Sequence, residues 1–199
     1  MDSLNVIEIP SLFQGKTIKR LSFKAEGLTI EKPLSFDQPV FIASENINAF
    51  RYGVKFLRGY RFYIGRIYFI ELKDVQNNVF RIKLKSYYGI KRDMYYKLWG
   101  DTMDRLWQNY FGSVLNYYVE LYKMKQSFKL LAVDFLTEGI SWEKGKILFW
   151  ENIALSNYVT YFMIHHKEVL SERKSYNFAN DWNALILQKL LKQVVAEYK

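Results

Sequence analysis

Cysteine is absent from this chain of 199 residues, and only three of its residues are proline. Without cysteine there is no disulfide framework, no thiolate nucleophile and no zinc site with cysteine ligands. No apolar run approaches the roughly 20 residues that a helix needs to span a bilayer, and no basic and apolar signal segment follows Met1. Half of the residues are hydrophobic, which excludes a disordered chain. We therefore expect a folded cytoplasmic protein, or one peripheral to a membrane.

Motifs that carry catalytic chemistry are also scarce. His165 and His166 are the two histidines of the chain, and in a strand they would point to opposite faces and so would not hold one metal ion. Asp101 and Asp104 lie three residues apart, which is a common spacing on a solvated helix. No phosphate-binding glycine loop or nucleophile elbow is present. We expect no cofactor, no metal and no catalytic residue; the remote alternative is a hydrolase in which the two aspartates and a histidine converge.

Two parts of the chain resemble each other. Residues Glu26–Lys32 match Glu138–Lys144. Further along the chain, Glu45–Ile47 match Glu151–Ile153, so the matches follow the same order in both parts. Each copy leads to an apolar, aromatic-rich stretch of helical period. Ordered matches of this kind predict an internal duplication, with chance similarity as the alternative.

The two units are expected at residues 1–125 and 126–199. Apolar periodicity predicts several strands followed by a helix in each unit. In the first unit, strands are expected at 28–30, 40–42, 48–57, 61–72 and 79–86, with a helix over 93–125 that Asp93 caps. In the second unit, strands are expected at 128–135, 139–142, 146–150 and 158–164, with a helix from Asn180 or Asp181 to about Glu197. These strands are too few for a complete second domain, which leaves open one continuous sheet shared by both units.

Positive charge is concentrated in the first unit. The chain has a net charge of +9, and the segment Arg51–Arg92 holds 11 basic residues against two acidic ones. In a strand, Arg81, Lys83 and Lys85 share one side while the apolar residues between them share the other. A hairpin through residues 74–78 is expected to bring Arg66 and Tyr68 alongside this row. The pattern predicts a basic sheet surface.

This surface has two interpretations. It is either an anion-binding face or an ordinary solvated strand whose charges prevent aggregation. On the first interpretation, the partner is an acidic protein or an anionic membrane surface, and the binding residues are Arg58, Arg61, Arg66, Arg81, Lys83 and Lys85. The alternative partner is single-stranded nucleic acid, whose bases would stack on Tyr63, Tyr68, Tyr87 and Tyr88.

One local pattern resembles a known family. Gly139-Ile140 enters a strand, and residues 147–153 end a short strand in a Trp, an acidic residue and an Ile. This resembles bacterial pleckstrin-homology-like (PH-like) domains, and Gly27-Leu28 with Glu45–Ile47 is the counterpart in the first unit. The resemblance implies an α+β protein of two PH-like units, each a strongly bent antiparallel sheet or partial barrel followed by a C-terminal helix. It implies a scaffold that binds lipids, peptides or proteins and is rarely catalytic. The first unit lacks the inositol-phosphate signature in its opening loop, so phosphoinositide binding does not follow.

Overall fold

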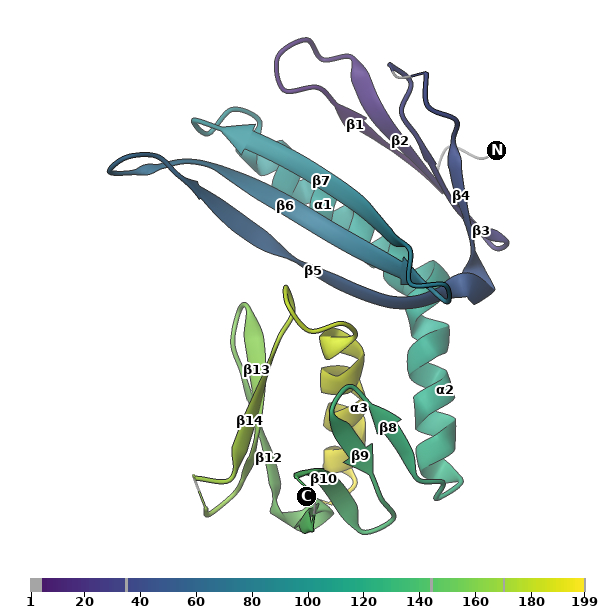
Figure 1. Cartoon of the computed structure of the whole chain (residues 1–199), viewed down its shortest axis with the longest axis vertical. Coiled ribbons are helices and arrows are strands. Elements are labelled where there is room, and N and C mark those ends of the chain that lie inside the picture. Colours follow the sequence, from purple (N-terminus) through teal and green to yellow (C-terminus); the bar gives the residue numbers. More distant parts are fainter. Residues whose placement is uncertain (1–4, 35, 144, 170, 199) are drawn as a thin grey trace. The chain divides into compact units, whose positions relative to one another are not determined.

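The chain folds into antiparallel sheets and a few helices (Figure 1), as a computed structural model describes it for residues 5–34, 36–143, 145–169 and 171–198. It divides into two compact units, with the boundary between Phe111 and Gly112. Each unit contains one four-stranded and one three-stranded antiparallel sheet. The prediction of a mixed α+β protein with antiparallel sheets and a C-terminal helix is therefore confirmed.

Unit 1 begins with a four-stranded sheet and continues with a three-stranded one. The first sheet consists of β1 (Val6–Pro10), β2 (Thr17–Lys24), β3 (Gly27–Glu31) and β4 (Val40–Ala43), in that order. The 3-10 turn η2 (Ser44–Asn46) leads to the second sheet, made of β5 (Ile47–Arg58), β6 (Tyr63–Asp74) and β7 (Val79–Tyr87). The five strands predicted for this unit are all present.

The single helix predicted for residues 93–125 is divided. The α-helix α1 (Arg92–Leu106) passes into a π-helical turn, η3 (Trp107–Phe111), and α2 (Gly112–Lys123) follows. Asp93 is not its N-cap, because the residue before α1 is Lys91 in a left-handed conformation. The predicted unit boundary after Lys125 differs from the observed division.

The reason for that difference is the packing of α2. The Tyr118 ring lies 5.5 Å from the Phe128 ring, and the Tyr122 ring lies 5.6 Å from the Trp150 ring. These partners all belong to the second unit. The sequence periodicity assigns α2 to the first unit, but its side chains pack in the core of the second unit.

Unit 2 contains more strands than the sequence predicts. Its first sheet consists of β8 (Phe128–Leu130), β9 (Val133–Phe135), β10 (Gly139–Glu143) and β11 (Lys146–Phe149). The 3-10 turn η4 (Trp150–Asn152) leads to β12 (Ile153–Asn157), β13 (Tyr161–His166) and β14 (Arg173–Asn177), and the helix α3 (Ala184–Ala196) ends the unit. The expected shortage of strands is wrong. The strand predicted over 128–135 is a tight hairpin that turns at Leu131, whose φ is +57°, and β12 and β14 contain few β-branched or aromatic residues.

The matching segments of the sequence occupy equivalent places in the two units. In each unit, the amide after the fourth strand donates to the carbonyl of the glutamate that opens the repeat: Ser44 to Glu26, and Trp150 to Glu138. In each unit, a later amide donates to the carbonyl of the repeated asparagine: Val75 to Asn46, and Lys167 to Asn152. From the first strand onward, both units thus have four strands, a 3-10 turn, three strands and a helix, with the same pair of connecting hydrogen bonds; unit 2 has the additional helix α2 before its first strand.

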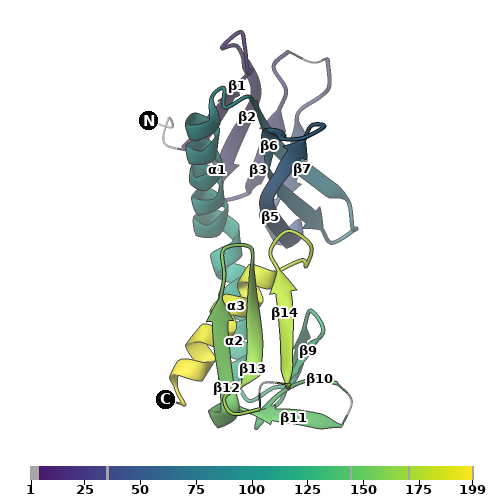
Figure 2. The same cartoon turned by 90° about the vertical axis from the view of Figure 1, so that its left-hand side faces the viewer.

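In unit 1, α1 covers one face of the β5–β6–β7 sheet. The Trp99 indole donates a hydrogen bond of 3.1 Å to the Phe69 carbonyl, and its ring lies 6.0 Å from the ring of Tyr68. The same helix runs beside β1 and β2 (Figure 2), where the Tyr95 hydroxyl donates to the Pro10 carbonyl over 2.9 Å. The face opposite α1 carries the exposed side chains of β7, and we call it the outward face of the β5–β6–β7 sheet.

Candidate functional site

Strand β7 has one buried and one exposed side. Arg81, Lys83 and Lys85 are exposed, whereas Ile82 and Leu84 are buried in the core. The alternation predicted for this strand is confirmed. These three cations form part of the outward face of the β5–β6–β7 sheet, which we call the basic face. Its members, paired across the three strands, are Arg51, Lys55, Ile67, Phe69, Glu71, Arg81, Lys83 and Lys85.

Arg66 and Tyr68 do not belong to the basic face. In the register of β6 and β7, Ile67 lies opposite Lys85, while Arg66 lies opposite the buried residue Ser86. Tyr68 is only 2% exposed, on the side that α1 covers. The expectation that these two residues line up with the β7 cations is wrong, because side chains of neighbouring residues in a strand point to opposite faces.

The carboxylate of the basic face is enclosed between two arginines. Glu71 is 6% exposed, and it accepts hydrogen bonds from Arg51 over 2.8 Å and from Arg81 over 2.9 Å. Burial by itself would raise the pKa of Glu71, but the two guanidinium groups outweigh it and lower the pKa below its ordinary value. Glu71 therefore stays ionised, and its negative charge is neutralised by Arg51 and Arg81 within the sheet.

The remaining cations of this face are directed at solvent. Lys83 and Lys85 are exposed and form no ion pair with any described carboxylate. The Lys55 ammonium lies 5.0 Å from the centroid of the Phe69 ring. Nearby, Lys19 donates a 3.2 Å hydrogen bond to the Arg81 carbonyl, and burial followed by the charges of Lys32 and Lys83 lowers its pKa. The basic face thus carries an uncompensated positive field.

Arg58 and Arg61 lie at the end of the β5–β6 hairpin. Its turn is closed by a 2.7 Å hydrogen bond from the Gly59 amide to the Phe62 carbonyl. We call this end the aromatic tip; it comprises Phe56, Arg58, Tyr60, Arg61, Phe62 and Tyr63. Its aromatic side chains are 55%, 90%, 62% and 69% exposed, for Phe56, Tyr60, Phe62 and Tyr63 in that order.

Two arginines stack on these exposed rings. The guanidinium of Arg66 lies 5.2 Å from the Phe56 ring centroid, and that of Arg61 lies 5.5 Å from the Tyr60 ring centroid. A hollow of about 240 Å³ lies beside the tip, with Phe56, Tyr63, Arg66 and Tyr88 among its lining residues. The six cations proposed from the sequence therefore fall into two groups: Arg58, Arg61 and Arg66 at the tip, and Arg81, Lys83 and Lys85 on the basic face.

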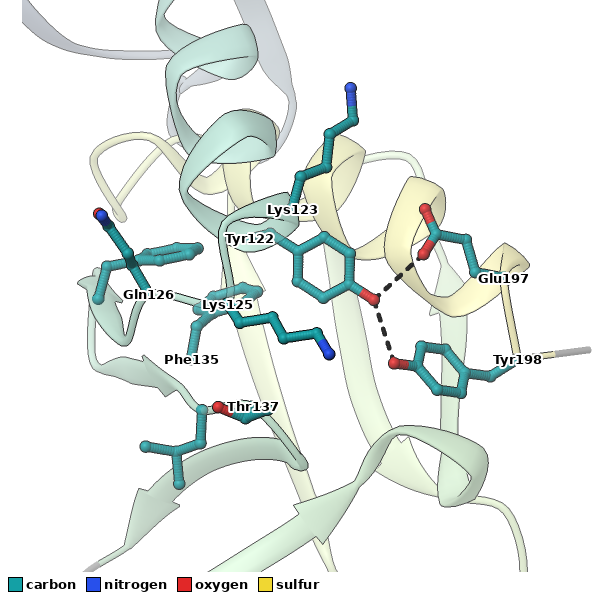
Figure 3. Close-up of a pocket in the computed structure, with 10 residues that line it drawn as sticks. Tyr122, Lys123, Lys125, Gln126, Phe135, Thr137, Glu197 and Tyr198 are labelled. Carbon is teal, nitrogen blue, oxygen red and sulfur yellow. Dashed lines mark hydrogen bonds between the residues drawn. The ribbon is translucent and has the colours of Figure 1, made fainter.

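Unit 2 has a hollow of about 400 Å³ between α2, α3 and the β8–β9 hairpin (Figure 3). The Tyr122 hydroxyl lies 3.2 Å from the Glu197 carboxylate and 3.2 Å from the Tyr198 hydroxyl. Because a tyrosine has one hydroxyl proton, Tyr122 donates to the carboxylate and accepts from Tyr198. Burial, followed by these two neighbours, raises the pKa of Tyr122. These polar groups satisfy one another, and we interpret the hollow as the edge of the core of unit 2.

The residues considered for catalysis have structural partners or belong to different units. His165 is 3.0 Å from the Ser156 hydroxyl, and His166 accepts hydrogen bonds from the backbone amides that follow β13. Asp101 and Asp104 are on α1, whereas both histidines are on β13 of the second unit. Among the described residues, no three His, Asp or Glu side chains are grouped as metal ligands.

No protein-family model matches this chain, and no curated protein matches it. None of the helices described is both long enough and apolar enough to cross a bilayer. Function is therefore inferred from the geometry of the two cationic groups. Sequence reasoning found the cations and Tyr63 but missed the exposed aromatic residues Phe56, Tyr60 and Phe62. The signal that was available is the placement of four aromatic residues and two arginines around one glycine, Gly59.

Proposed function

We propose that the protein is a non-enzymatic interaction module of two PH-like units related by duplication, and that unit 1 binds an anionic membrane surface through its basic face. From the first strand onward, the order of elements is the same in the two units, which supports the duplication. So do the two equivalent hydrogen bonds in each unit, which the backbone carbonyls of the repeated glutamate and asparagine accept. A protein of this kind would act in the cytoplasm, at or near a membrane.

The membrane proposal is carried by one observation: Lys83 and Lys85 are exposed and form no ion pair with a described carboxylate, on a face where two arginines already neutralise Glu71. Each lysine held near an anionic lipid surface contributes about 1 kcal/mol to binding at moderate salt.

A nucleic-acid partner is less well supported. Of the four tyrosines expected to stack on bases, Tyr68 is buried against α1, and Tyr87 is half-buried opposite Gly65. Tyr63 and Tyr88 remain exposed, but stacking of successive bases needs a continuous platform of rings along the strand. An acidic protein would also satisfy the lysines, and the experiment below distinguishes it from lipid.

The experiment is co-sedimentation with vesicles of phosphatidylcholine, with and without phosphatidylglycerol. Charge reversal at Lys83 and Lys85 together should lower the affinity for anionic vesicles at least roughly 30-fold, because about 2 kcal/mol of attraction is lost and repulsion by the new negative charges is added. Arg81 is left unchanged because its reversal would place a negative charge beside Glu71. The matched control reverses Lys167 and Lys192, two exposed lysines of unit 2.

The control variant has the same net charge as the test variant, so a general effect of charge would weaken both equally. Equal binding of the wild type and the Lys83/Lys85 variant would overturn the proposal. If the wild type fails to bind anionic vesicles but binds a polyglutamate column, the partner is an acidic protein and not a lipid surface. Release of bound protein by single-stranded DNA would show that the basic face accepts polyanions in general.

A further inference from the structure

The aromatic tip is not explained by the folding of unit 1. Tyr60 and Phe62 are 90% and 62% exposed, although tyrosine and phenylalanine gain free energy when their rings leave water. Among the described residues, the ring contacts of the tip are Phe56 with Tyr63 and the two arginine contacts already given. Exposed aromatic residues that cluster in this way indicate a surface that another apolar phase covers.

The charges around the tip select the kind of partner. No acidic residue occurs between Asn46 and Ile70, whereas Arg58 and Arg61 belong to the tip and Arg66 lies over the Phe56 ring. Aromatic rings with an apolar body and a polar edge concentrate at the interface between lipid chains and headgroups. Arginine side chains bury their stems and keep the guanidinium group at the level of phosphate. The combination fits the interface of an anionic bilayer.

The shape of the hairpin also fits this partner. Strand β7 ends opposite Gly65, since Tyr87 is the last β7 residue that pairs with β6. The turn between Arg58 and Tyr63 therefore extends past the three-stranded part of the sheet (Figure 1). Its exposed rings can enter the headgroup layer, where water still satisfies the open backbone groups of the turn.

We propose that the aromatic tip is a membrane anchor, and that Tyr60 and Phe62 enter the interface of an anionic bilayer while Arg58 and Arg61 bind lipid phosphates. This inference rests on the proposed function and names the element that enters the lipid. Lys85 pairs with Ile67, and Ile67 lies four residues after Tyr63, where β6 begins. At about 3.4 Å per residue, Lys85 is about 14 Å from the tip, so an inclined sheet brings both to the headgroups.

The absence of cysteine makes the depth of insertion directly measurable. A single cysteine introduced as Phe62→Cys provides a unique site for an environment-sensitive fluorophore. Gln76→Cys is the control, because Gln76 is exposed in the β6–β7 turn at the other end of the same sheet. With anionic vesicles, the label at position 62 should shift to the blue and be quenched by lipids that carry a nitroxide in the headgroup region. The label at position 76 should not change.

A second variant tests the anchor without a label. Tyr60→Ser with Phe62→Ser keeps every charge and should lower affinity for anionic vesicles about tenfold or more. Phe62→Trp should keep the affinity of the wild type. Both side chains are exposed, so the melting temperature should not fall, and circular dichroism verifies this.

The two proposals fail in different ways. Vesicle binding with an unchanged label at position 62, or undiminished binding of the double serine variant, would overturn the anchor and leave the basic face as the binding site. Loss of binding in the serine variant, together with undiminished binding of the Lys83/Lys85 variant, would support the anchor and would contradict a role for the basic face. Absence of vesicle binding by the wild type would overturn both.

Discussion

Arg66 and Lys85 lie on neighbouring strands of one sheet, yet their side chains are on opposite faces. Lys85 belongs to the outward basic face, and Arg66 stacks on Phe56 at the end of the hairpin. The cations that appear as one group in the sequence therefore form two sites with different chemistry. The basic face offers charge alone, and the aromatic tip combines charge with apolar area.

The two sites should respond differently to salt. Electrostatic attraction by Lys83 and Lys85 is screened over a Debye length of about 8 Å at physiological ionic strength. Insertion of Tyr60 and Phe62 depends on apolar burial, which salt does not weaken. We therefore expect the Lys83/Lys85 charge-reversal variant to bind vesicles with a shallower salt dependence than the wild type, and the Tyr60/Phe62 serine variant to keep the slope of the wild type. Sedimentation across a salt series measures both slopes, and a common slope for all three proteins would be evidence against two sites.

Glu71 should make the stability of unit 1 sensitive to acid. Its pKa is lowered in the folded state, so its contribution is complete above the pKa of an unfolded glutamate, about 4.3, and is lost as the pH falls through the folded pKa. We expect Glu71→Gln to lower the free energy of unfolding by about 1–3 kcal/mol at neutral pH and to reduce its dependence on pH in the acid range.

Urea unfolding at a series of pH values measures this effect. Glu45→Gln is the control, since Glu45 is exposed and its substitution should leave the acid slope unchanged. A Glu71→Gln protein with the stability and the acid slope of the wild type would show that the Arg51–Glu71–Arg81 group contributes nothing to folding.

Replacement of Tyr176 by phenylalanine should stabilise unit 2. Its hydroxyl is buried and has no hydrogen-bond partner among the described residues, and a buried unpaired polar group costs about 1–3 kcal/mol. Tyr176→Phe is expected to stabilise unit 2 by about 1 kcal/mol. Thermal unfolding tests this, with Tyr158→Phe as the control because Tyr158 is exposed. A lower melting temperature for Tyr176→Phe would mean that the hydroxyl is bonded in solution.

The same tyrosine should respond to alkali. Burial, followed by the charge of Asp181, raises the pKa of Tyr176. The folded state therefore disfavours ionisation of Tyr176, and the free energy of unfolding falls as the pH rises above the pKa of an unfolded tyrosine, about 10. Tyr176→Phe should lose less stability between neutral and alkaline pH than the wild type, while Tyr122, whose pKa is also raised, leaves a residual slope. Identical slopes would assign the alkaline response to other groups.

The two repeated glycines should be equally intolerant of a side chain. A Cβ atom on Gly27 would overlap the Ile42 carbonyl oxygen, and one on Gly139 would overlap the Leu148 carbonyl oxygen. We expect alanine at either position to destabilise its unit by about 1–3 kcal/mol. Gly100→Ala is the control, since it meets open space in α1 and should stabilise by about 0.5–1 kcal/mol. Chemical denaturation measures all three, and a neutral Gly139→Ala would remove the equivalence of the two positions.

Sequence periodicity predicted local structure well where it was strong. The alternation from Arg81 to Lys85 gave the correct buried and exposed sides of β7, because period-two burial is a local property. The strands β12 and β14 were missed because residues such as those of Arg173–Asn177 have little intrinsic strand preference and are held by pairing with β13.

The composition of the surface could not be predicted in the same way. The face on which Arg66 lies depends on the pairing of Lys73 with Val79 across the β6–β7 turn, and one residue more or less would reverse it. Likewise, Tyr68 and Tyr60 are the same residue type in similar sequence surroundings, but one is in the core and the other is exposed. That distinction depends on where α1 packs on the sheet, and a local sequence pattern does not predict this packing.

The most direct test of membrane binding is co-sedimentation of the wild-type protein and its Lys83/Lys85 charge-reversal variant with anionic vesicles at physiological salt. We expect the wild type and the Lys167/Lys192 control to sediment together with anionic vesicles but not with neutral ones, and the Lys83/Lys85 variant to stay largely in solution. Equal sedimentation of all three proteins, or none by the wild type, would contradict a role for the basic face in binding membranes.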